Sequence, residues 1–148
     1  MELADALSFA RGRRQGVLTT IWAKGRPQLS NIVYALGDDD VARISVTDCR
    51  AKTRNLRQDP RASLYVVGDD FWSYVVLDGT AELTPVAADP ADETVDELVA
   101  LYRAVAGEHP DWDEFRNDMV ADSRLAVRLR IDHVYGIDTD TQNRSDFP

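Results

Sequence analysis

The strongest constraint on the fold of this chain is a series of short, apolar and β-branched segments separated by turns that contain Gly and Asp. Segments 17–22 and 28–36 flank a turn centred on Gly25 and are predicted to form a hairpin. Gly79 marks a predicted bulge or bend inside the long segment 72–84. The six predicted strands are 17–22, 28–36, 41–47, 62–67, 72–84 and 124–131. They favour a closed antiparallel barrel, because closure removes the unpaired edges of a small sheet.

Apolar residues at helical spacing predict four helices beside these strands. The predicted helices are 3–13, 50–58, 90–106 and 111–121. Asp48 is expected to cap the second helix. The third has Asp89 at its cap, Pro90 at its first position and Gly107 after its end. The chain is therefore predicted to be mainly β with helices, and its length suits a single domain over residues 1–148.

Composition excludes several classes of function. The 148 residues carry 26 acids and 17 basic residues, a formal charge of −9, which argues against general binding of nucleic acid. No apolar run approaches the ~20 residues of a membrane span. The first residues lack the basic and apolar regions of a signal peptide, so a cytoplasmic location is expected. One cysteine, Cys49, and two histidines predict neither a disulfide framework nor a metal site.

Positive charge is concentrated in one stretch of this acidic chain, "SVTDCRAKTRNLRQDPRA" at 45–62. Its basic residues are Arg50, Lys52, Arg54, Arg57 and Arg61. Cations in the first turn of a helix oppose the helix dipole, but the penalty reverses when an anion is bound there. One hypothesis is that Arg50, Lys52, the hydroxyl of Thr53 and backbone N–H groups bind a phosphate. The alternative is a solvated basic face paired with nearby Asp residues.

A second polar feature lies in the predicted strand that begins near residue 28. Gln28 and Ser30 lie on one face of this strand, and Leu29 and Asn31 lie on the other. Polar groups at this point suit hydrogen bonding to the edge of a planar heterocycle. The alternative is that residues 28–31 form the solvated end of a hairpin.

Two aromatic residues share a face of the predicted strand 72–84. Trp72 and Tyr74 are placed to flank a flat ligand, although such a pair is also typical of ordinary core packing. His109 lies in a predicted turn between helices, and His133 follows the last predicted strand. Both histidines fit structural or surface roles better than catalytic ones. The sequence contains no arrangement of nucleophile, base and acid, and it identifies no catalytic residue.

Several motifs together resemble a known family. They are "GVLTTIWAKGRPQLSNIVYAL", "RAKTRNLRQDPRASL", "WSYVVLDGTAELTP", "LYRAVAGEHPDWDEFR" and "HVYG". The chain is similar over residues 7–136 to the split-barrel flavin- and deazaflavin-binding family related to pyridoxamine 5′-phosphate oxidase. Within it, the coenzyme F420-dependent reductases are the most similar branch. The resemblance implies an FMN-binding split barrel of six or so antiparallel strands. It also implies a homodimer with a cofactor site at each interface.

The resemblance also implies roles for particular residues. Arg50, Lys52 and Thr53 are expected at the cofactor phosphate. The other expected contacts are Gln28, Ser30 and Asn31 at the ring and its chain, Ile44, Ser45 and Val46 along the ring, Trp72 and Tyr74 at the partner's site, and Arg54 and Arg57 at the glutamate tail of F420. The cationic segment is thus interpreted as a local anion site.

The function implied is hydride transfer from reduced F420 to a small unsaturated or heterocyclic substrate. An FMN-dependent oxidoreductase and a non-catalytic carrier of F420 or flavin are the alternatives. The proton donor is left open between Tyr74, Lys52, His133 and solvent. Residues 133–148 lack the second basic cluster with which pyridoxamine phosphate oxidases hold their product, so oxidation of vitamin B6 is not expected. The sequence does not identify the physiological substrate.

Overall fold

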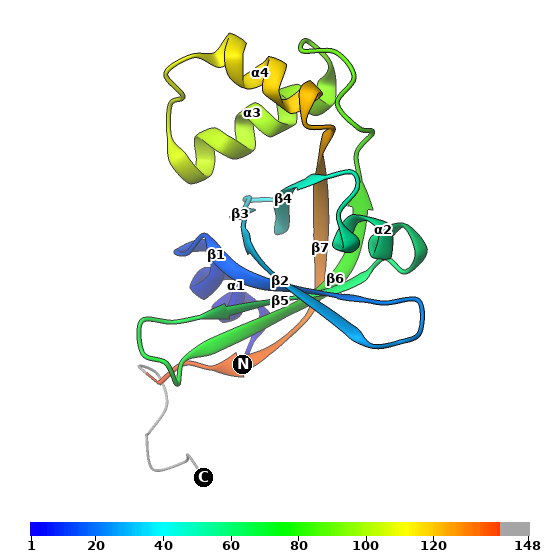
Figure 1. Ribbon diagram of the computed structural model, residues 1–148. Coiled ribbons are helices and arrows are strands. Elements are labelled where there is room, and N and C mark those ends of the chain that lie inside the picture. Colours follow the sequence, from blue (N-terminus) through cyan, green and yellow to red (C-terminus); the bar gives the residue numbers. More distant parts are fainter. Residues whose placement is uncertain (140–148) are drawn as a thin grey trace.

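The computed structural model describes residues 1–139, in which one curled sheet is accompanied by helices (Figure 1). The strands are β1 (Gln15–Ile21), β2 (Pro27–Val33), β3 (Ala35–Leu36), β4 (Val41–Thr47), β5 (Arg61–Val67), β6 (Tyr74–Leu83) and β7 (Arg124–Ile137). The helices are α1 (Leu3–Arg11), α2 (Ala51–Gln58), α3 (Glu93–Ala106) and α4 (Trp112–Ala121). The mainly β fold predicted from the sequence is confirmed, and the last nine residues, 140–148, lie outside the described part.

The order of the strands explains why the sheet curls. All neighbours are antiparallel, in the order β2-β1-β5-β6-β7-β4-β3. β2 and β3 lie at opposite edges, yet only Tyr34 separates them in the chain. Because one residue spans less than ~4 Å, the two edges must approach each other. The result is a half-barrel whose two edge strands are connected by the backbone at Tyr34. Among the described residues no hydrogen-bonded ladder joins β2 to β3, so the predicted closed barrel is wrong on this point.

Tyr34 makes this corner and divides the single strand predicted over 28–36. Its backbone N–H donates to the carbonyl of Arg14, which is the last contact in the register of the β1–β2 pairing before the chain turns to β3. The side chain is completely buried, and its hydroxyl donates to the carbonyl of Ala10 in α1 at 2.6 Å. Burial raises the pKa of this phenol far above its usual range. Tyr34 thereby links the corner of the sheet to the first helix.

The bulge predicted at Gly79 is confirmed. Asp78 pairs with His133, but Gly79 pairs with Ile131, so Asp132 is an extra residue on β7. A Cβ atom at position 79 would lie 2.1 Å from the carbonyl oxygen of Arg130, which only glycine avoids.

Two predicted strand ends differ from the structure. β6 begins at Tyr74, two residues later than predicted. Trp72 lies in the preceding turn with Phe71, so it does not share a strand face with Tyr74. β7 continues to Ile137 instead of ending at residue 131. It continues through the polar residues Asp132 and His133 because β6 supplies pairing partners as far as Tyr74.

The predicted helix caps needed correction too. Asp92, not Asp89, caps α3, since its carboxylate accepts from the backbone N–H of Val95 at 2.8 Å. Pro90 accordingly lies in a turn before the helix. Asp48 does not cap α2, whose N-cap residue is Arg50. Instead, Asp48 forms an ion pair with Arg57 at 2.6 Å.

Two apolar clusters hold these elements together. The larger fills the concave side of the sheet and includes Leu18, Leu64 and Leu77. The smaller joins α3 and α4 and packs against Ala126 of β7. Figure 1 shows this helix pair beyond one end of the sheet and α1 near the other end. No helix within residues 1–139 is long and apolar enough to cross a membrane.

Candidate cofactor site

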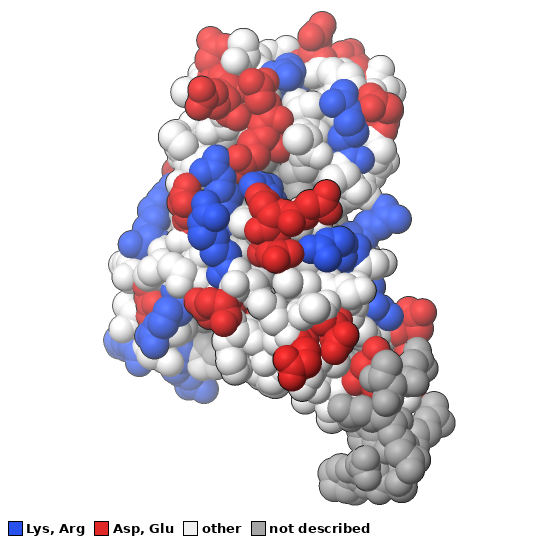
Figure 2. Space-filling model, turned by 180° about the vertical axis from the view of Figure 1, so that it is seen from behind, with Lys and Arg blue, Asp and Glu red and all other residues white. Residues whose placement is uncertain are grey.

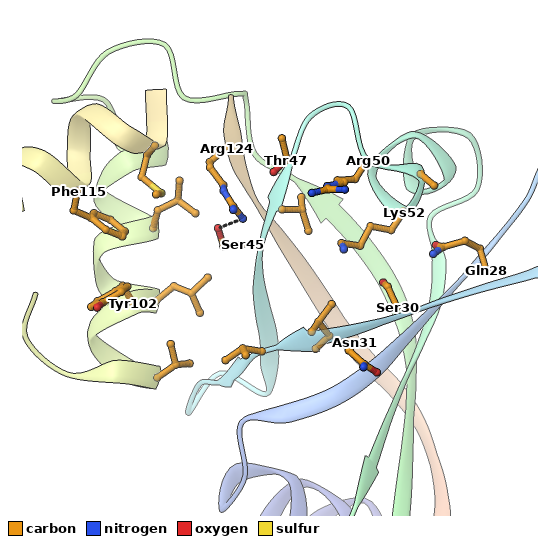
Figure 3. Close-up of a pocket in the computed structure, with 18 residues that line it drawn as sticks. Gln28, Ser30, Asn31, Ser45, Thr47, Arg50, Lys52, Tyr102, Phe115 and Arg124 are labelled. Atoms are coloured by element: carbon orange, nitrogen blue, oxygen red, sulfur yellow. Dashed lines mark hydrogen bonds between the residues drawn. The ribbon is translucent and has the colours of Figure 1, made fainter. Parts of the chain in front are cut away.

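A cavity of about 820 Å³ lies between the sheet and the α3–α4 helix pair (Figure 3). Its polar wall comes from β2, the end of β4, the start of α2 and the start of β7, with the side chains of Gln28, Ser30, Ser45, Thr47, Arg50, Lys52 and Arg124. Its apolar wall comes from the two helices, with Leu98, Leu101, Tyr102, Val105, Phe115 and Met119. The cavity therefore suits a ligand with anionic groups and a large apolar or aromatic body.

The cations of this cavity lack acidic partners. Among residues 1–139, no ion pair includes Arg50, Lys52 or Arg124. Partial burial of the ammonium lowers the pKa of Lys52, and the positive charges of Arg50 and Arg124 lower it further. A bound anion would remove this repulsion.

Most of the basic residues elsewhere are paired. The described ones outside the cavity that form no ion pair are Arg14, Lys24, Arg26 and Arg54. Figure 2 shows acidic and basic side chains next to each other over the face seen from behind. Arg128, for example, lies 2.6 Å from Glu97 and 2.7 Å from Glu82. Among residues 1–139, the cavity thus brings three cations without ion pairs together in one place.

Two buried polar atoms of the cavity also lack partners. Within the part of the chain that the structure describes, Ser30 Oγ and Arg124 Nε make no hydrogen bond. Arg124 Nη1 lies 3.5 Å from Ser45 Oγ, which is a weak contact (Figure 3). Unsatisfied buried polar groups are costly, and a polar ligand would satisfy these two atoms if their side chains turned toward the cavity.

Gln28 is held in place by a chain of side-chain hydrogen bonds. Asn55 of α2 donates to Thr20 Oγ1 at 3.1 Å, and Thr20 donates to Gln28 Oε1 at 2.7 Å. Thr20 and Asn55 are buried, so this chain connects α2, β1 and β2 beneath the cavity floor. This support is not predictable from the sequence, because nothing local relates residues 20, 28 and 55.

The structure brings together part of the predicted site. The predicted residues that line the cavity are Gln28, Ser30, Asn31, Ser45, Val46, Arg50 and Lys52. Asn31 also lines a second hollow of about 460 Å³ on the outer face of the sheet. This double position follows from its place on β2, the edge strand.

Other predicted residues lie outside the cavity wall. Ile44 is in the core, 1% exposed. The hydroxyl of Thr53 is buried and donates to the carbonyl of Thr47 at 2.8 Å, and its expected contact with a phosphate stays a prediction. Arg54 is exposed, and Arg57 is paired with Asp48.

The two predicted aromatic residues are also elsewhere. Trp72 is 62% exposed beside Phe71, and Tyr74 stacks on Tyr65 with ring centroids 5.5 Å apart. Neither lines the cavity of its own chain. Their role at a partner's site stays a prediction.

Arg124 and the apolar wall were missed. Arg124 opens β7 and pairs with Thr47, which places it beside the loop that carries Arg50. In the sequence it looks like Arg128 and Arg130, which occupy the same face of the strand. Leu98, Tyr102 and Val105 were predicted only as the apolar stripe of a helix.

Comparison with known proteins agrees with this geometry. The profile of the pyridoxamine 5′-phosphate oxidase family matches residues 4–138. The chain belongs to this family. The family includes oxidoreductases, and membership in it accounts for the split-barrel architecture. It does not by itself select the cofactor.

Solved structures with a similar fold carry names that describe different functions. A conserved hypothetical protein from Mycobacterium tuberculosis is 26% identical, with a TM-score of 0.71 over 93% of this chain and 85% of that one. A heme-binding protein from Mycobacterium smegmatis is also 26% identical, with a TM-score of 0.67 over 90% of this chain and 52% of its own. A protein named F420 reductase is 24% identical, with a TM-score of 0.63 over 86% of this chain and 94% of its own. At this identity the likeness establishes a shared fold and no more.

Proposed function

We propose that this protein binds coenzyme F420 in the cavity between the sheet and α3–α4. It then catalyses hydride transfer from the reduced cofactor to a small unsaturated or heterocyclic substrate. The observation that carries the proposal is the set of cations on the polar wall, beside the N-terminus of α2, that have no acidic partner within residues 1–139. Helix N-terminal N–H groups and basic side chains together are a typical phosphate site.

The residues present fit a ribityl phosphate with a planar ring. Arg50, Lys52 and the first N–H groups of α2 hold the phosphate. Ser30 and Gln28 meet the polar edge of the ring, where Ser30 Oγ lacks a partner within the described chain. Exposed Arg54 continues the positive charge along α2, which suits a tail of glutamates. The bound deazaflavin supplies the hydride, and the protein supplies orientation and shelter from water.

The structure narrows the choice of proton donor within one chain. Neither Tyr74 nor His133 lines the cavity. Tyr74 stacks on Tyr65, and His133 Nδ1 lies 2.9 Å from Asp78 Oδ2. Of the candidate side chains, Lys52 is the one that lines the cavity. Within a single chain, we therefore assign proton delivery to Lys52 or to water held beside it.

The homodimer belongs to this proposal. The outer face of the sheet exposes Leu29 (60%), Val33 (46%), Val67 (41%) and Tyr135 (48%). These residues lie on β2, β5 and β7, and a second copy of the chain would cover them. Phe71 and Trp72, which are 71% and 62% exposed, would then be able to reach the partner's cavity.

The experiment is a titration of the purified chain with F420 and with FMN. We expect F420 to bind and its reduced form to be oxidised when enones are added. The double variant Arg50→Met, Lys52→Met should lose at least ~100-fold in affinity, since each charged hydrogen bond contributes ~1.5–3 kcal/mol. Arg26→Met, in the turn between β1 and β2, is the matched control.

The alternatives give different results. A yellow protein that retains FMN on purification would support an FMN-dependent oxidoreductase instead. Binding of F420 without turnover of any substrate would support a carrier. Unchanged F420 and FMN affinities in the double variant would show that the phosphate site is elsewhere. Heme is not favoured, because neither His109 nor His133 lines the cavity and histidine is a common axial ligand.

A further inference from the structure

The cavity has two chemically different halves, and Arg124 lies where they meet. In Figure 3, Arg50 and Lys52 lie toward α2 and β2, whereas Arg124 lies on the side of β4 that faces α3 and α4. The wall opposite Arg124 is apolar and comprises Leu98, Leu101, Val105, Phe115 and Met119. A cofactor phosphate held by Arg50 and Lys52 leaves this second half for another molecule.

Arg124 differs from the other arginines of its strand. Arg128 is paired with Glu82 and Glu97, and Arg130 lies 3.5 Å from Glu82. Arg124 has no ion pair with any residue between 1 and 139, and its Nε is buried without a hydrogen-bond partner there. A structural arginine would be expected to have such partners. Arg124 lines the cavity, and among residues 1–139 its Nη1 makes only the weak contact with Ser45, so the Nη groups keep N–H donors that a ligand can use.

We propose that Arg124 recognises the carboxylate of a substrate whose apolar, ring-sized body packs against α3 and α4. The proposal rests on the proposed function in one respect, since it assigns the phosphate of the cofactor to Arg50 and Lys52. The planar guanidinium offers two parallel N–H groups to the two oxygens of a carboxylate. The apolar body replaces water along the helix wall, so both halves of the molecule contribute to affinity.

Ser45 is a positioning residue in this arrangement. Its hydroxyl lies 3.5 Å from Arg124 Nη1, a weak contact that places the guanidinium beside β4. Lys52 is close enough for Arg124 to influence its pKa. A carboxylate bound at Arg124 therefore lies near the group to which we assign proton delivery.

The experiment uses the full chain and calorimetric titration with 2-naphthoate, and with methyl 2-naphthoate as the uncharged control. The parent should bind the acid at least ~10-fold more tightly than the ester. Arg124→Met should remove this preference and leave the affinity for the ester within about twofold. Met119→Gln should weaken both naphthyl probes, and Arg26→Met should change neither. Arg124→Lys, which keeps the charge without the fork, should give an intermediate affinity and guards against a folding defect in Arg124→Met.

FMN and riboflavin, which differ by the phosphate, separate this role from phosphate binding. Arg124→Met should leave the ratio of their affinities unchanged, whereas Arg50→Met with Lys52→Met should reduce it. A parent that does not distinguish the acid from the ester would overturn the proposal. An Arg124→Met variant that still prefers 2-naphthoate to its methyl ester would overturn it too. The same holds for an Arg124→Met variant that loses affinity for FMN and for no other ligand. If the Arg50→Met, Lys52→Met variant binds F420 and FMN as the parent does, the proposed function fails. The naphthoate titrations would still show whether Arg124 binds a carboxylate.

Discussion

At the scale of single residues, pairing separates the cations that stabilise the surface from those that form the site. Arg57 is paired with Asp48 and Arg61 with Asp59, and exposed pairs of this kind contribute ~0–1 kcal/mol. Lys52 has no such partner among residues 1–139, and its pKa is lowered by burial and by two neighbouring arginines. The site therefore costs stability until an anion is bound.

Lys52→Met should raise the stability of the ligand-free protein at neutral pH. A lowered pKa means that the folded state holds its proton less tightly than the unfolded state. The penalty is present below the lowered pKa and is relieved as the pH rises toward 10.5, the ordinary value. Urea unfolding of the parent and the variant between pH 7 and pH 10 measures this difference in stability.

The other lysine of the chain provides the control. Lys24 is exposed in the turn between β1 and β2, and Lys24→Met removes the same charge from a position outside the cavity. The difference between the parent and Lys52→Met should shrink with rising pH. A difference that stays constant across this range would contradict the assigned cause.

At the scale of the elements, local interactions decide where each helix and strand begins and bends. α3 begins after Asp92 because that carboxylate accepts from the backbone N–H groups of Ala88, Asp89 and Val95. Asp89 makes a shorter-range contact with the N–H of Ala91. The sequence contains both carboxylates, and only the path of the chain before the helix shows which one receives the helix N–H group.

Asp92→Ala should lower the free energy of unfolding by ~1–2 kcal/mol, as loss of a helix cap does. Asp89→Ala, the cap predicted from the sequence, should cost less. Burial raises the pKa of Asp92, but hydrogen bonds from the N–H groups of Ala88, Val95, Asp89 and Thr94 outweigh it and lower the pKa below 3.8. Its contribution is present above that pH and is lost as the pH falls through the lowered value. Urea unfolding at pH 7 and at pH 3 tests both points, and equal costs for the two variants would contradict the assignment.

The bulge between β6 and β7 gives a second prediction at this scale. Gly79→Ala places a Cβ atom against the carbonyl of Arg130, which belongs to a paired strand and cannot move freely. We expect a loss of about 1–3 kcal/mol or more in thermal or urea unfolding. In Gly12→Ala the nearest atom is 3.8 Å away, so stability should be unchanged or slightly higher. A Gly79→Ala protein as stable as the parent would show that the bulge is not required.

At the scale of the whole molecule, the sheet has two faces with different roles. The concave face is filled by the core. The outer face exposes Leu29, Val33, Val67 and Tyr135. An exposed apolar area spread over several strands is typical of a surface that is covered in the assembled protein.

The proposed homodimer is tested by light scattering after gel filtration at micromolar concentration. The parent should have twice the mass of one chain. Val67→Glu places a charge on the outer face, at the end of β5, and should yield monomers, because an unpaired charge in an apolar interface is costly. Leu3→Glu, on α1 and 47% exposed, should leave the dimer intact. A monomeric parent would refute this part of the proposal.

Much of the architecture followed from local sequence patterns. Alternating β-branched segments identified the strands, and Gly79 identified the bulge, because these features depend on neighbouring residues and on backbone geometry. The division at Tyr34 was not predictable in this way. Residues 28–36 read as one strand, and the break arises because the chain passes from one edge of the sheet to the other at that point.

The site divides in the same manner. The sequence alone determined that positive charge gathers around residue 50 and that Gln28 and Ser30 share a strand face, since both are properties of consecutive residues. Only the tertiary structure decided that Thr53 and Arg57 are occupied within the chain and that Arg124 joins Arg50 and Lys52. It also decided that α3 and α4 supply the opposite wall. Such arrangements depend on strand register and on helix packing between residues far apart in the chain, where each side chain competes for partners that no local pattern reveals.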